Sequence, residues 1–550
     1  MQTAPNEQPA SPRPERKAHL LRGLTYGLVT ILVFLLGIST ATYFGIGGRR
    51  GSSSKLDEIY SLIQQYYVDS TNMDSLAEET LPFILSQLDP HSVYLNAEEN
   101  KASTETLEGS FAGIGIQFNT LLDTVVVVRV IEGGPSERAG LQAGDRILRA
   151  DTTSFLRDSL TSEQIMKALK GPEDTVVKLT LQRGKKVFTT SVVRGAVPVP
   201  TLDASYMIRP HVLYVRLNKW GTQTPLEFQQ AYADHASEGV ERILLDLRDN
   251  GGGYLQAATT LASEFLSKGD LLVYNKGAHY PREDFKCPRD GRLRHVPLTV
   301  LVNENSASAS EIFAGAMQDL DRALIVGRRT FGKGLVQLPF ELRDHSVIRL
   351  TVARYYTPSG RSIQKSYAKG YEAYAEDIED RYLHGELYSA DSISRPDTTR
   401  YYTRLGRTVY GGGGITPDIF TPRDSTGFNP YYIRLLRSGT LQRFAFSYAD
   451  SHREQFLRLG SDAAVQEYLQ AQGEQIVYAY ARYADQKGGV AQRPGYLQES
   501  MAILRRDLTA LIYDLLGRDK DAFYRMHNER DPEVLKALEQ LTSPAWRPHK

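Results

Sequence analysis

The 550-residue chain contains a single cysteine, Cys287, and has no excess of either charge, because 65 basic residues balance 65 acidic ones. One cysteine excludes a disulfide framework within the chain and a cysteine-rich zinc site. The missing basic excess argues against a nucleic-acid-binding protein, since such proteins neutralise phosphates with surplus Lys and Arg. The shortage of cysteine does not settle the compartment, because many exported proteins also lack this residue.

The composition is that of a globular protein. Hydrophobic residues make up 41% of the chain and charged residues 24%, so nothing indicates wholesale disorder. At about 100–200 residues per domain, a chain of this length holds three or four domains. The sequence shows no internal repeat.

Charged residues are also absent from the run Gly23–Gly48, whose centre reads LVTILVFLLGI. This run exceeds the roughly 20 residues that a helix needs to span a bilayer. A cleaved signal peptide is the alternative, but the run is long for one and Ser39-Thr40-Ala41 matches a cleavage site poorly. Basic residues on both sides give little signal for orientation. We predict a tail over 1–22, an uncleaved transmembrane anchor over 23–48, and export of the remainder.

The exported part divides by pattern into four regions. Apolar residues at helical spacing predict a helical segment over 55–105. A β-rich stretch follows over 106–195, and strands alternate with helices over 196–425. Such alternation predicts a sheet with helices packed on its faces. Residues 364–410 are polar and Tyr-rich, which predicts a surface insertion, and 426–550 predict a helical C-terminal extension.

One segment combines a buried strand, a polar turn and a helix. Leu298–Val302 predicts the strand, Asn303–Ser306 the turn, and the helix begins at about Ser308. Glu311 follows three residues later, so Ser308 could serve only as a helix cap in a capping box. Alternatively, Ser308 is a nucleophile, and the amide of Ala309 with the helix N-terminus would stabilise an oxyanion. The serine taken alone favours the cap.

A serine nucleophile needs a base, and Lys333 is the best candidate. The histidines lack a partnering motif, whereas Lys333 lies between two glycines that allow a tight bend. The lysine must be neutral, which requires burial among uncharged groups. Gln337, four residues later, would lie on the same face of an extended segment. Its amide would hold the lysine without raising the pKa as a carboxylate would.

Gly327–Lys333 also fits the G-x-x-x-x-G-K spacing of a phosphate-binding loop. However, Gly334 stands where that loop needs a Mg²⁺-binding Ser or Thr, and a strand-like segment follows instead of a helix. We therefore do not predict nucleotide binding.

Several motifs in a consistent order resemble the C-terminal processing peptidases, also called tail-specific proteases. The matching motifs are LDPHSVYL, SASASEI, QDLDRALIVG, TFGKGLVQ, TVARYYTPSGRSI and GITPD. The resemblance extends over roughly residues 55–365 and 412–420. The resemblance implies that Ser308 is the nucleophile, Lys333 the general base and Gln337 its support. It also implies that a glycine-rich turn supplies a second oxyanion amide, here from Gly251 or Gly252 in LRDNGGG.

The β-rich stretch resembles a PDZ domain. Its loop contains Gly113, Ile114, Gly115 and Ile116, and GGPSERAGLQAGDRIL follows. Such a loop can bind a C-terminal carboxylate with backbone amides, while the adjoining strand adds the peptide to its sheet. The alternative is a PDZ groove that docks only on its own chain.

The resulting prediction is an α+β multidomain protein. It comprises the anchor, a small helical segment over 55–105, a β-sandwich-like PDZ domain over 106–195, an α/β peptidase core over 196–425 and a helical extension over 426–550. We expect a serine endopeptidase that cleaves near the C-terminal tails of exported proteins without a metal or cofactor. A single helix would anchor it in the inner (plasma) membrane. Its catalytic part would lie on the periplasmic or extracytoplasmic side. The extension could serve a homo-oligomer or an adaptor, and the rival function is a non-catalytic PDZ adaptor.

Overall fold

The computed structural model describes residues 55–121, 124–156, 160–395, 397–517 and 521–543. The predicted tail over 1–22 and the predicted anchor over 23–48 lie outside these residues. Among the helices within them, none is both long and apolar enough to cross a bilayer. The chain divides into two compact units, Met1–Ile84 and Leu85–Lys550.

The described residues of the first unit form helices, as the apolar spacing predicts. Helix α2 spans Lys55–Tyr66, and α3 spans Met73–Ser86. In the second unit the chain forms α4, Ala97–Glu108, where Asn96 and Glu99 make a capping box. The prediction missed β1, Val93–Leu95, because three residues are too few for a recognisable alternation.

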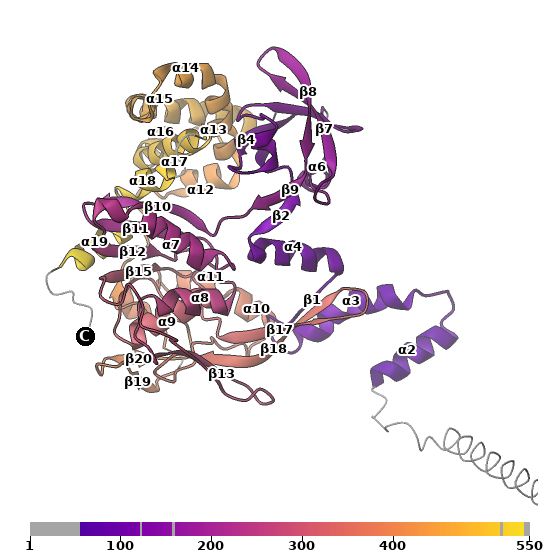
Figure 1. The fold of residues 1–550 in the computed structure, drawn as a ribbon, viewed down its shortest axis with the longest axis vertical. Helices are drawn as coiled ribbons and strands as arrows, with labels where there is room; N and C mark the ends of the chain where they lie inside the picture. The colour runs from indigo at the N-terminus through magenta and orange to yellow at the C-terminus, as the bar shows by residue number, and fades with distance from the viewer. Residues whose placement is uncertain (1–54, 122–123, 157–159, 396, 518–520, 544–550) are drawn as a thin grey trace, which may run out of the picture. The chain divides into compact units, whose positions relative to one another are not determined.

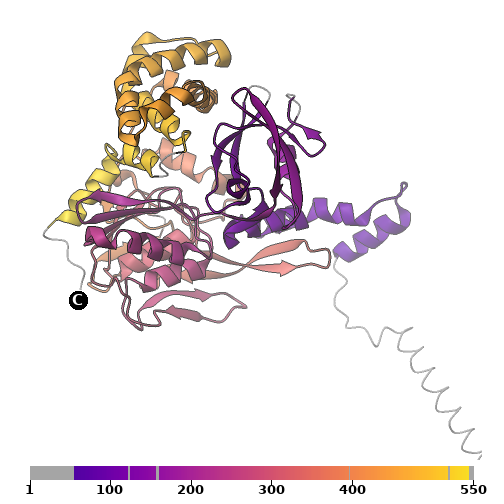
Figure 2. The same cartoon turned by 45° about the horizontal axis from the view of Figure 1, so that its top comes forward.

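A curved antiparallel sheet forms the PDZ-like region (Figure 2). Its strand order is β3-β4-β5-β7-β8, with β6 beside β5, and β2 pairs separately with β9. The strands are β2 Ser110–Gly113, β3 Ile116–Leu121, β4 Thr124–Val130, β5 Arg146–Ala150, β6 Thr153–Ser154, β7 Val176–Arg183, β8 Lys186–Val193 and β9 Gly195–Pro198, and the helices are α5 Pro135–Arg138 and α6 Ser162–Leu169. Ile165 and Leu169 of α6 pack with Val127, Ile147 and Leu179 in the core of this region.

The following region is built on a six-stranded sheet with the order β10-β11-β12-β15-β16-β21 (Figure 1). All strands except β10 run parallel. The strands are β10 Leu202–Arg209, β11 Val212–Leu217, β12 Arg242–Asp246, β15 Leu298–Val302, β16 Leu324–Gly327 and β21 Ile419–Phe420, and the helices are α7 Thr224–Asp234, η1 Ala236–Glu238, α8 Leu255–Ser263 and α9 Ala309–Asp319. The predicted alternation of strands and helices is confirmed.

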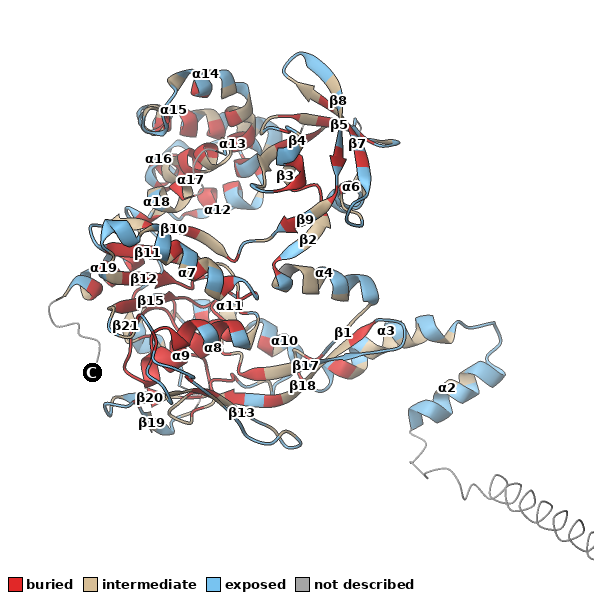
Figure 3. Cartoon of the chain, in the orientation of Figure 1, coloured by how far each residue is buried: buried red, intermediate tan, exposed pale blue. Residues whose placement is uncertain are grey.

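The two faces of this sheet are covered by different parts of the chain. Leu213 and Val215 of β11 share a core with α7, α8 and α9. Tyr214, between them, faces the other side, where it packs with Leu538 of the last helix, α19 Pro532–Thr542. Figure 3 shows the strands and α9 as buried. The parallel strands are therefore apolar on both faces, as parallel sheets between helices are.

A second, antiparallel sheet joins β1, β18, β13 and β14, with β17 also paired to β18. Its strands are β13 Leu271–Lys276, β14 Glu283–Lys286, β17 Leu335–Glu341 and β18 Val347–Tyr356. Strand β1, which follows α3 in the sequence, pairs with β18 in this sheet, and Val93 lies opposite Arg349. The sheet thus brings the LDPHSVYL motif to the hairpin that follows Lys333.

The stretch 364–410, predicted as a surface insertion, combines many exposed residues with a few buried ones. It contains α10 Tyr371–Ala375, α11 Asp377–Leu383, η2 Ala390–Ser392, β19 Arg400–Tyr402 and β20 Thr408–Tyr410. Glu386 is buried there and forms ion pairs with two buried arginines, Arg381 and Arg329. Polar composition did not reveal this, because charged side chains can be buried when they are paired.

The predicted helical extension begins with a helical cluster of its own. Its helices are α12 Pro430–Arg437, α13 Thr440–Ser451, α14 Arg453–Leu459, α15 Asp462–Gly488, α16 Pro494–Glu499, α17 Met501–Asp514 and α18 Ala522–Asn528. Two ion pairs connect this cluster to the PDZ-like sheet, Arg146–Asp450 at 2.6 Å and Arg129–Asp514 at 2.7 Å. The chain then continues into α19, which covers one face of the parallel sheet, and Tyr524 of α18 packs against the same core.

Candidate active site

Ser308 occupies a strained turn between a buried strand and a buried helix. The turn connects β15 to α9, and Ser308 has φ 56° and ψ −115°. Cap residues normally have extended backbone angles, so capping alone does not explain this conformation. Strain of this kind persists where the surroundings enforce it, often at functional sites. The amide of Ala309 donates no hydrogen bond to any described residue, so it is available to an oxyanion.

Lys333 lies in a second tight turn, just before β17. A side chain at Gly334 would meet the backbone nitrogen of Gln364 at 2.9 Å, so only glycine fits there. Burial lowers the pKa of the Lys333 ammonium, although the Asp89 and Glu311 carboxylates act in the opposite direction. A lowered pKa raises the fraction of neutral amine that can accept a proton.

Gln337 contacts Lys333, as their spacing predicts. Lys333 Nζ donates to Gln337 Oε1 at 3.3 Å, and Gln337 Nε2 in turn donates to the carbonyl of His91. Burial and the nearby Lys333 lower the pKa of His91 to about 4, so this ring is neutral beside the lysine. Within the described residues, no hydrogen bond joins Lys333 Nζ to Ser308 Oγ.

Glu311 joins the two turns, a role that the sequence did not reveal. Its fully buried carboxylate accepts hydrogen bonds from the backbone N–H of Ser308 at 2.9 Å and of Lys333 at 2.8 Å. It also accepts from Gly332 N–H at 2.7 Å and from the Thr330 hydroxyl at 2.5 Å. Burial raises the pKa of Glu311 to about 7, while the four donors favour its charged form. The capping-box spacing was the only sequence signal for this residue.

Tyr355 forms a second link between the same turns. Its buried hydroxyl lies 3.1 Å from the carbonyl oxygen of Ser308 and also donates to that of Lys333. Glu311 thus holds the N–H groups and Tyr355 the carbonyl groups of the two residues. The separation of the Ser308 and Lys333 backbones is fixed from both sides.

The glycine-rich loop after β12 lies against Ser308 at one of the two predicted glycines. A Cβ atom on Gly252 would come within 2.7 Å of Ser308 Cβ, and Gly252 has φ +106°. A Cβ atom on Gly251 would meet nothing within 4 Å. The Gly252 N–H donates to Asn250 Oδ1 at 3.0 Å, so this amide is already engaged. The contact singles out Gly252 as the glycine beside Ser308.

The predicted PDZ loop has two backbone N–H groups without an acceptor among the described residues, those of Ile114 and Gly115. The carbonyls of the same residues accept from Ser136 at 2.8 Å and Ile131 at 3.0 Å. Gly115 has φ +74°, while Gly113 ends β2 and Ile116 begins β3. In its sheet β3 pairs only with β4, so an edge remains on which a peptide could add.

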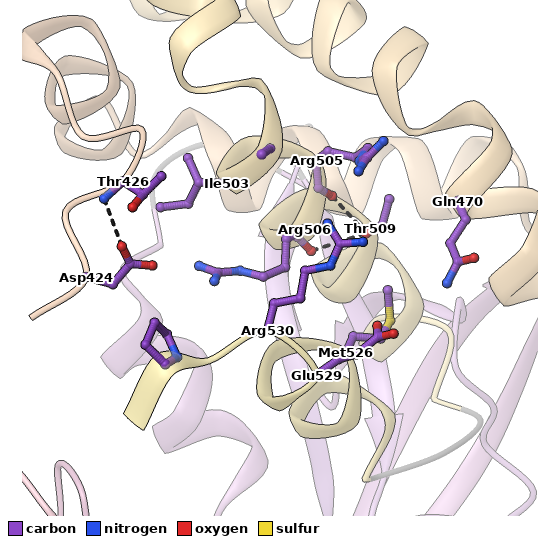
Figure 4. Close-up of a pocket in the computed structure, with 12 residues that line it drawn as sticks. Asp424, Thr426, Gln470, Ile503, Arg505, Arg506, Thr509, Met526, Glu529 and Arg530 are labelled. Carbon is purple, nitrogen blue, oxygen red and sulfur yellow. Dashed lines mark hydrogen bonds between the residues drawn. The ribbon is translucent and has the colours of Figure 1, made fainter. Parts of the chain in front are cut away.

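A cavity of about 560 Å³ lies elsewhere, in the helical cluster and beside the start of α19 (Figure 4). Three arginines line it together with two acids: Arg505, Arg506, Arg530, Asp424 and Glu529. None of the predicted site residues borders this cavity.

Sequence models of three families match the chain. They are the PDZ domain over residues 112–193, peptidase family S41 over 211–373 and a family of unknown function, DUF8443, over 431–516. A probable CtpA-like serine protease of Staphylococcus haemolyticus (strain JCSC1435) is 30% identical over 387 residues, 68% of this chain and 76% of that protein. This chain belongs to the C-terminal processing peptidases of family S41. It is a serine-type peptidase with a PDZ domain.

A second relative and a solved structure are also similar to the chain. A probable CtpA-like serine protease of Staphylococcus aureus (strain MRSA252) is 32% identical to the peptidase over 314 residues, 56% of the chain and 62% of that relative. Among solved structures, the photosystem II D1 C-terminal processing protease is 26% identical, with a TM-score of 0.34, and the match covers 67% of this chain and 92% of that one. The match to the S. aureus relative spans about three fifths of that protein's length.

Proposed function

We propose that this peptidase is an endopeptidase that binds the C-terminal tail of a substrate protein with its PDZ domain and cleaves that substrate near its tail. Ser308 is the nucleophile, Lys333 the general base, and Gln337 orients the lysine. The observation that carries this proposal is the pair of buried groups, Glu311 and Tyr355, that join the Ser308 and Lys333 turns.

In the proposed mechanism, neutral Lys333 removes the proton from Ser308 Oγ as that oxygen attacks the scissile carbonyl. The Ala309 amide stabilises the oxyanion, together with the Gly252 amide once it turns from Asn250. Protonated Lys333 then gives its proton to the leaving amine, and a water molecule, activated by the same lysine, hydrolyses the acyl-enzyme. Because Lys333 and Ser308 share no hydrogen bond at rest, a small movement of the lysine side chain precedes attack.

The substrate class is proposed from the PDZ loop. The free amides of Ile114 and Gly115 offer two donors to a terminal carboxylate, and the open edge of β3 offers a strand partner. The uncharged run Gly23–Gly48 supports a membrane anchor, and we place the peptidase on its extracytoplasmic side. The substrates would then be exported proteins with exposed tails.

The test uses peptides with a free C-terminal tail and three forms of the chain: wild type, Ser308→Ala and Lys333→Ala. We expect both variants to lose cleavage by at least about 1,000-fold, because removing a nucleophile or its base has effects of this size. Tail binding, measured by fluorescence anisotropy, should be unchanged. Cleavage that persists in Ser308→Ala would contradict the proposal, and wild-type binding without cleavage would favour the PDZ adaptor.

A further inference from the structure

The C-terminal helix α19 sends one carboxylate, that of Glu533, into the loops around the proposed site. Glu533 is 7% exposed and makes ion pairs with two arginines that are themselves buried, Arg248 and Arg328. Both arginines lie more than 200 residues before Glu533 in the sequence, and for Arg328 the separation is 205 residues. No local sequence pattern predicts such contacts.

Arg248 belongs to the glycine-rich loop that contacts Ser308. Its guanidinium binds Asp246 at 2.6 Å on the β12 side and Asp531 at 2.6 Å and Glu533 at 3.3 Å on the α19 side. The next residue of the loop, Asp249, is bound to Asn303 of the serine turn at 2.8 Å. The loop is thus held by α19 on one side and by the serine turn on the other.

Arg328 begins the segment that leads from β16 to Lys333. Its guanidinium binds Glu304 of the serine turn at 2.7 Å and also Glu533. Four buried carboxylates hold this segment: Glu304 and Glu533 at Arg328, Glu386 at Arg329 and Glu311 at Thr330. Glu533 is the member of this series that also reaches the glycine-rich loop.

We infer that Glu533 is a positioning residue for the peptidase reaction, which sets the glycine-rich loop and the lysine segment relative to Ser308. This inference rests on the proposed Ser308–Lys333 mechanism and adds α19 to the catalytic core. Removing the charge of Glu533 leaves Arg328 with Glu304 alone and Arg248 with fewer carboxylates. Both loops can then shift, and small displacements of catalytic groups have large effects on rate.

The experiment compares Glu533→Gln with Glu539→Gln in the full chain. Glu539 lies on the same helix, pairs only with Lys536 and has a side chain that is 62% exposed, so the chemical change is matched. We expect Glu533→Gln to lower kcat by about tenfold or more, within the range for misplaced catalytic groups, with KM changed less than about twofold. Glu539→Gln should match wild type.

Two further measurements separate positioning from a loss of folding. All rates are taken where circular dichroism shows each variant fully folded. A peptide aldehyde, whose adduct with serine carries an oxyanion, should bind Glu533→Gln more weakly by a factor similar to the loss in kcat. The tail peptide should bind equally to Ser308→Ala and to the Ser308→Ala, Glu533→Gln double variant.

The possible results are distinct. Unchanged kcat in folded Glu533→Gln would overturn the inference while leaving the Ser308 mechanism intact. A loss that only follows the unfolded fraction, with normal aldehyde affinity, would also overturn it. Failure of the underlying function would show instead as activity in Ser308→Ala.

Discussion

Glu311 lies where the two turns of the site meet, and its chemistry makes a definite prediction. In Glu311→Gln an amide nitrogen replaces one carboxylate oxygen. This nitrogen cannot accept the hydrogen bonds that the replaced oxygen now receives from two donors. Leaving about two buried donors unpaired should lower the free energy of unfolding by roughly 2–4 kcal/mol. Cleavage should fall more than stability explains, because Ser308 and Lys333 lose their common acceptor.

Chemical denaturation and peptide cleavage, measured on the same samples, check this prediction. Glu341→Gln is the matched control, because its carboxylate is 64% exposed and pairs with His345 on the surface. Wild-type activity in Glu311→Gln would show that the shared carboxylate does not position the two residues.

Gln337 accepts a hydrogen bond from the Lys333 ammonium, which leads to a prediction for pH dependence. Burial lowers the lysine pKa, so kcat/KM should rise with pH through an apparent pKa below the ordinary value of ~10.4. In Gln337→Glu a carboxylate would favour the charged lysine and raise its pKa. The ascending limb should therefore move to higher pH, by about one unit or more.

A pH–rate profile from pH 5 to pH 11 measures this shift. Gln470→Glu, at an exposed position in the helical cluster, introduces the same charge and should leave the profile in place. A profile that moves to lower pH in Gln337→Glu, or does not move, would exclude Lys333 as the titrating base.

At the scale of elements, the sequence predicted local structure well and long-range contacts poorly. Strand β15 has the predicted ends, Leu298–Val302, because its short apolar run is followed directly by a polar turn. Ser308, Lys333 and Gln337 were found through motifs. The roles of Tyr355 and His91 were not predicted, although both lie in matching motifs, because they reach the site through a sheet that joins β1, β17 and β18. No local pattern encodes that pairing.

Helix α19 was the largest omission at this scale. It was predicted only as part of an extension, yet it covers one face of the parallel sheet. Leu538→Ala should therefore destabilise the peptidase core by about 2–5 kcal/mol, the usual cost of truncating a buried leucine. The buried position of Leu538, which is 5% exposed, is the reason.

Thermal and urea unfolding check the role of α19. Leu535→Ala provides the control, because Leu535 lies on the same helix and is 41% exposed. It should change stability by no more than about 0.5 kcal/mol. Equal effects of the two substitutions would contradict the placement of α19 on the sheet.

At the scale of the whole molecule, the proposed mechanism gives the PDZ region and the peptidase core separate tasks in one reaction. The free amides at Ile114 and Gly115 predict that the tail carboxylate contributes to binding. A substrate peptide with an amidated C-terminus should show a KM about tenfold higher, because a charge-assisted hydrogen bond contributes about 1.5 kcal/mol. Its kcat should change little, since the PDZ loop does not touch the reacting bond.

Steady-state kinetics with paired acid and amide peptides make this comparison. A peptide with an extra residue after the same tail keeps the carboxylate and controls for length. If acid and amide peptides have equal KM values, the PDZ loop does not recognise the terminal carboxylate.

The central claim is that Ser308 is the nucleophile and that Lys333 activates it. The most direct measurement is labelling with a fluorophosphonate, followed by peptide mapping with mass spectrometry. We predict a single adduct on Ser308 in wild type, none in Ser308→Ala and strongly slowed labelling in Lys333→Ala. An adduct on another serine, or labelling at the wild-type rate in Lys333→Ala, would contradict the mechanism.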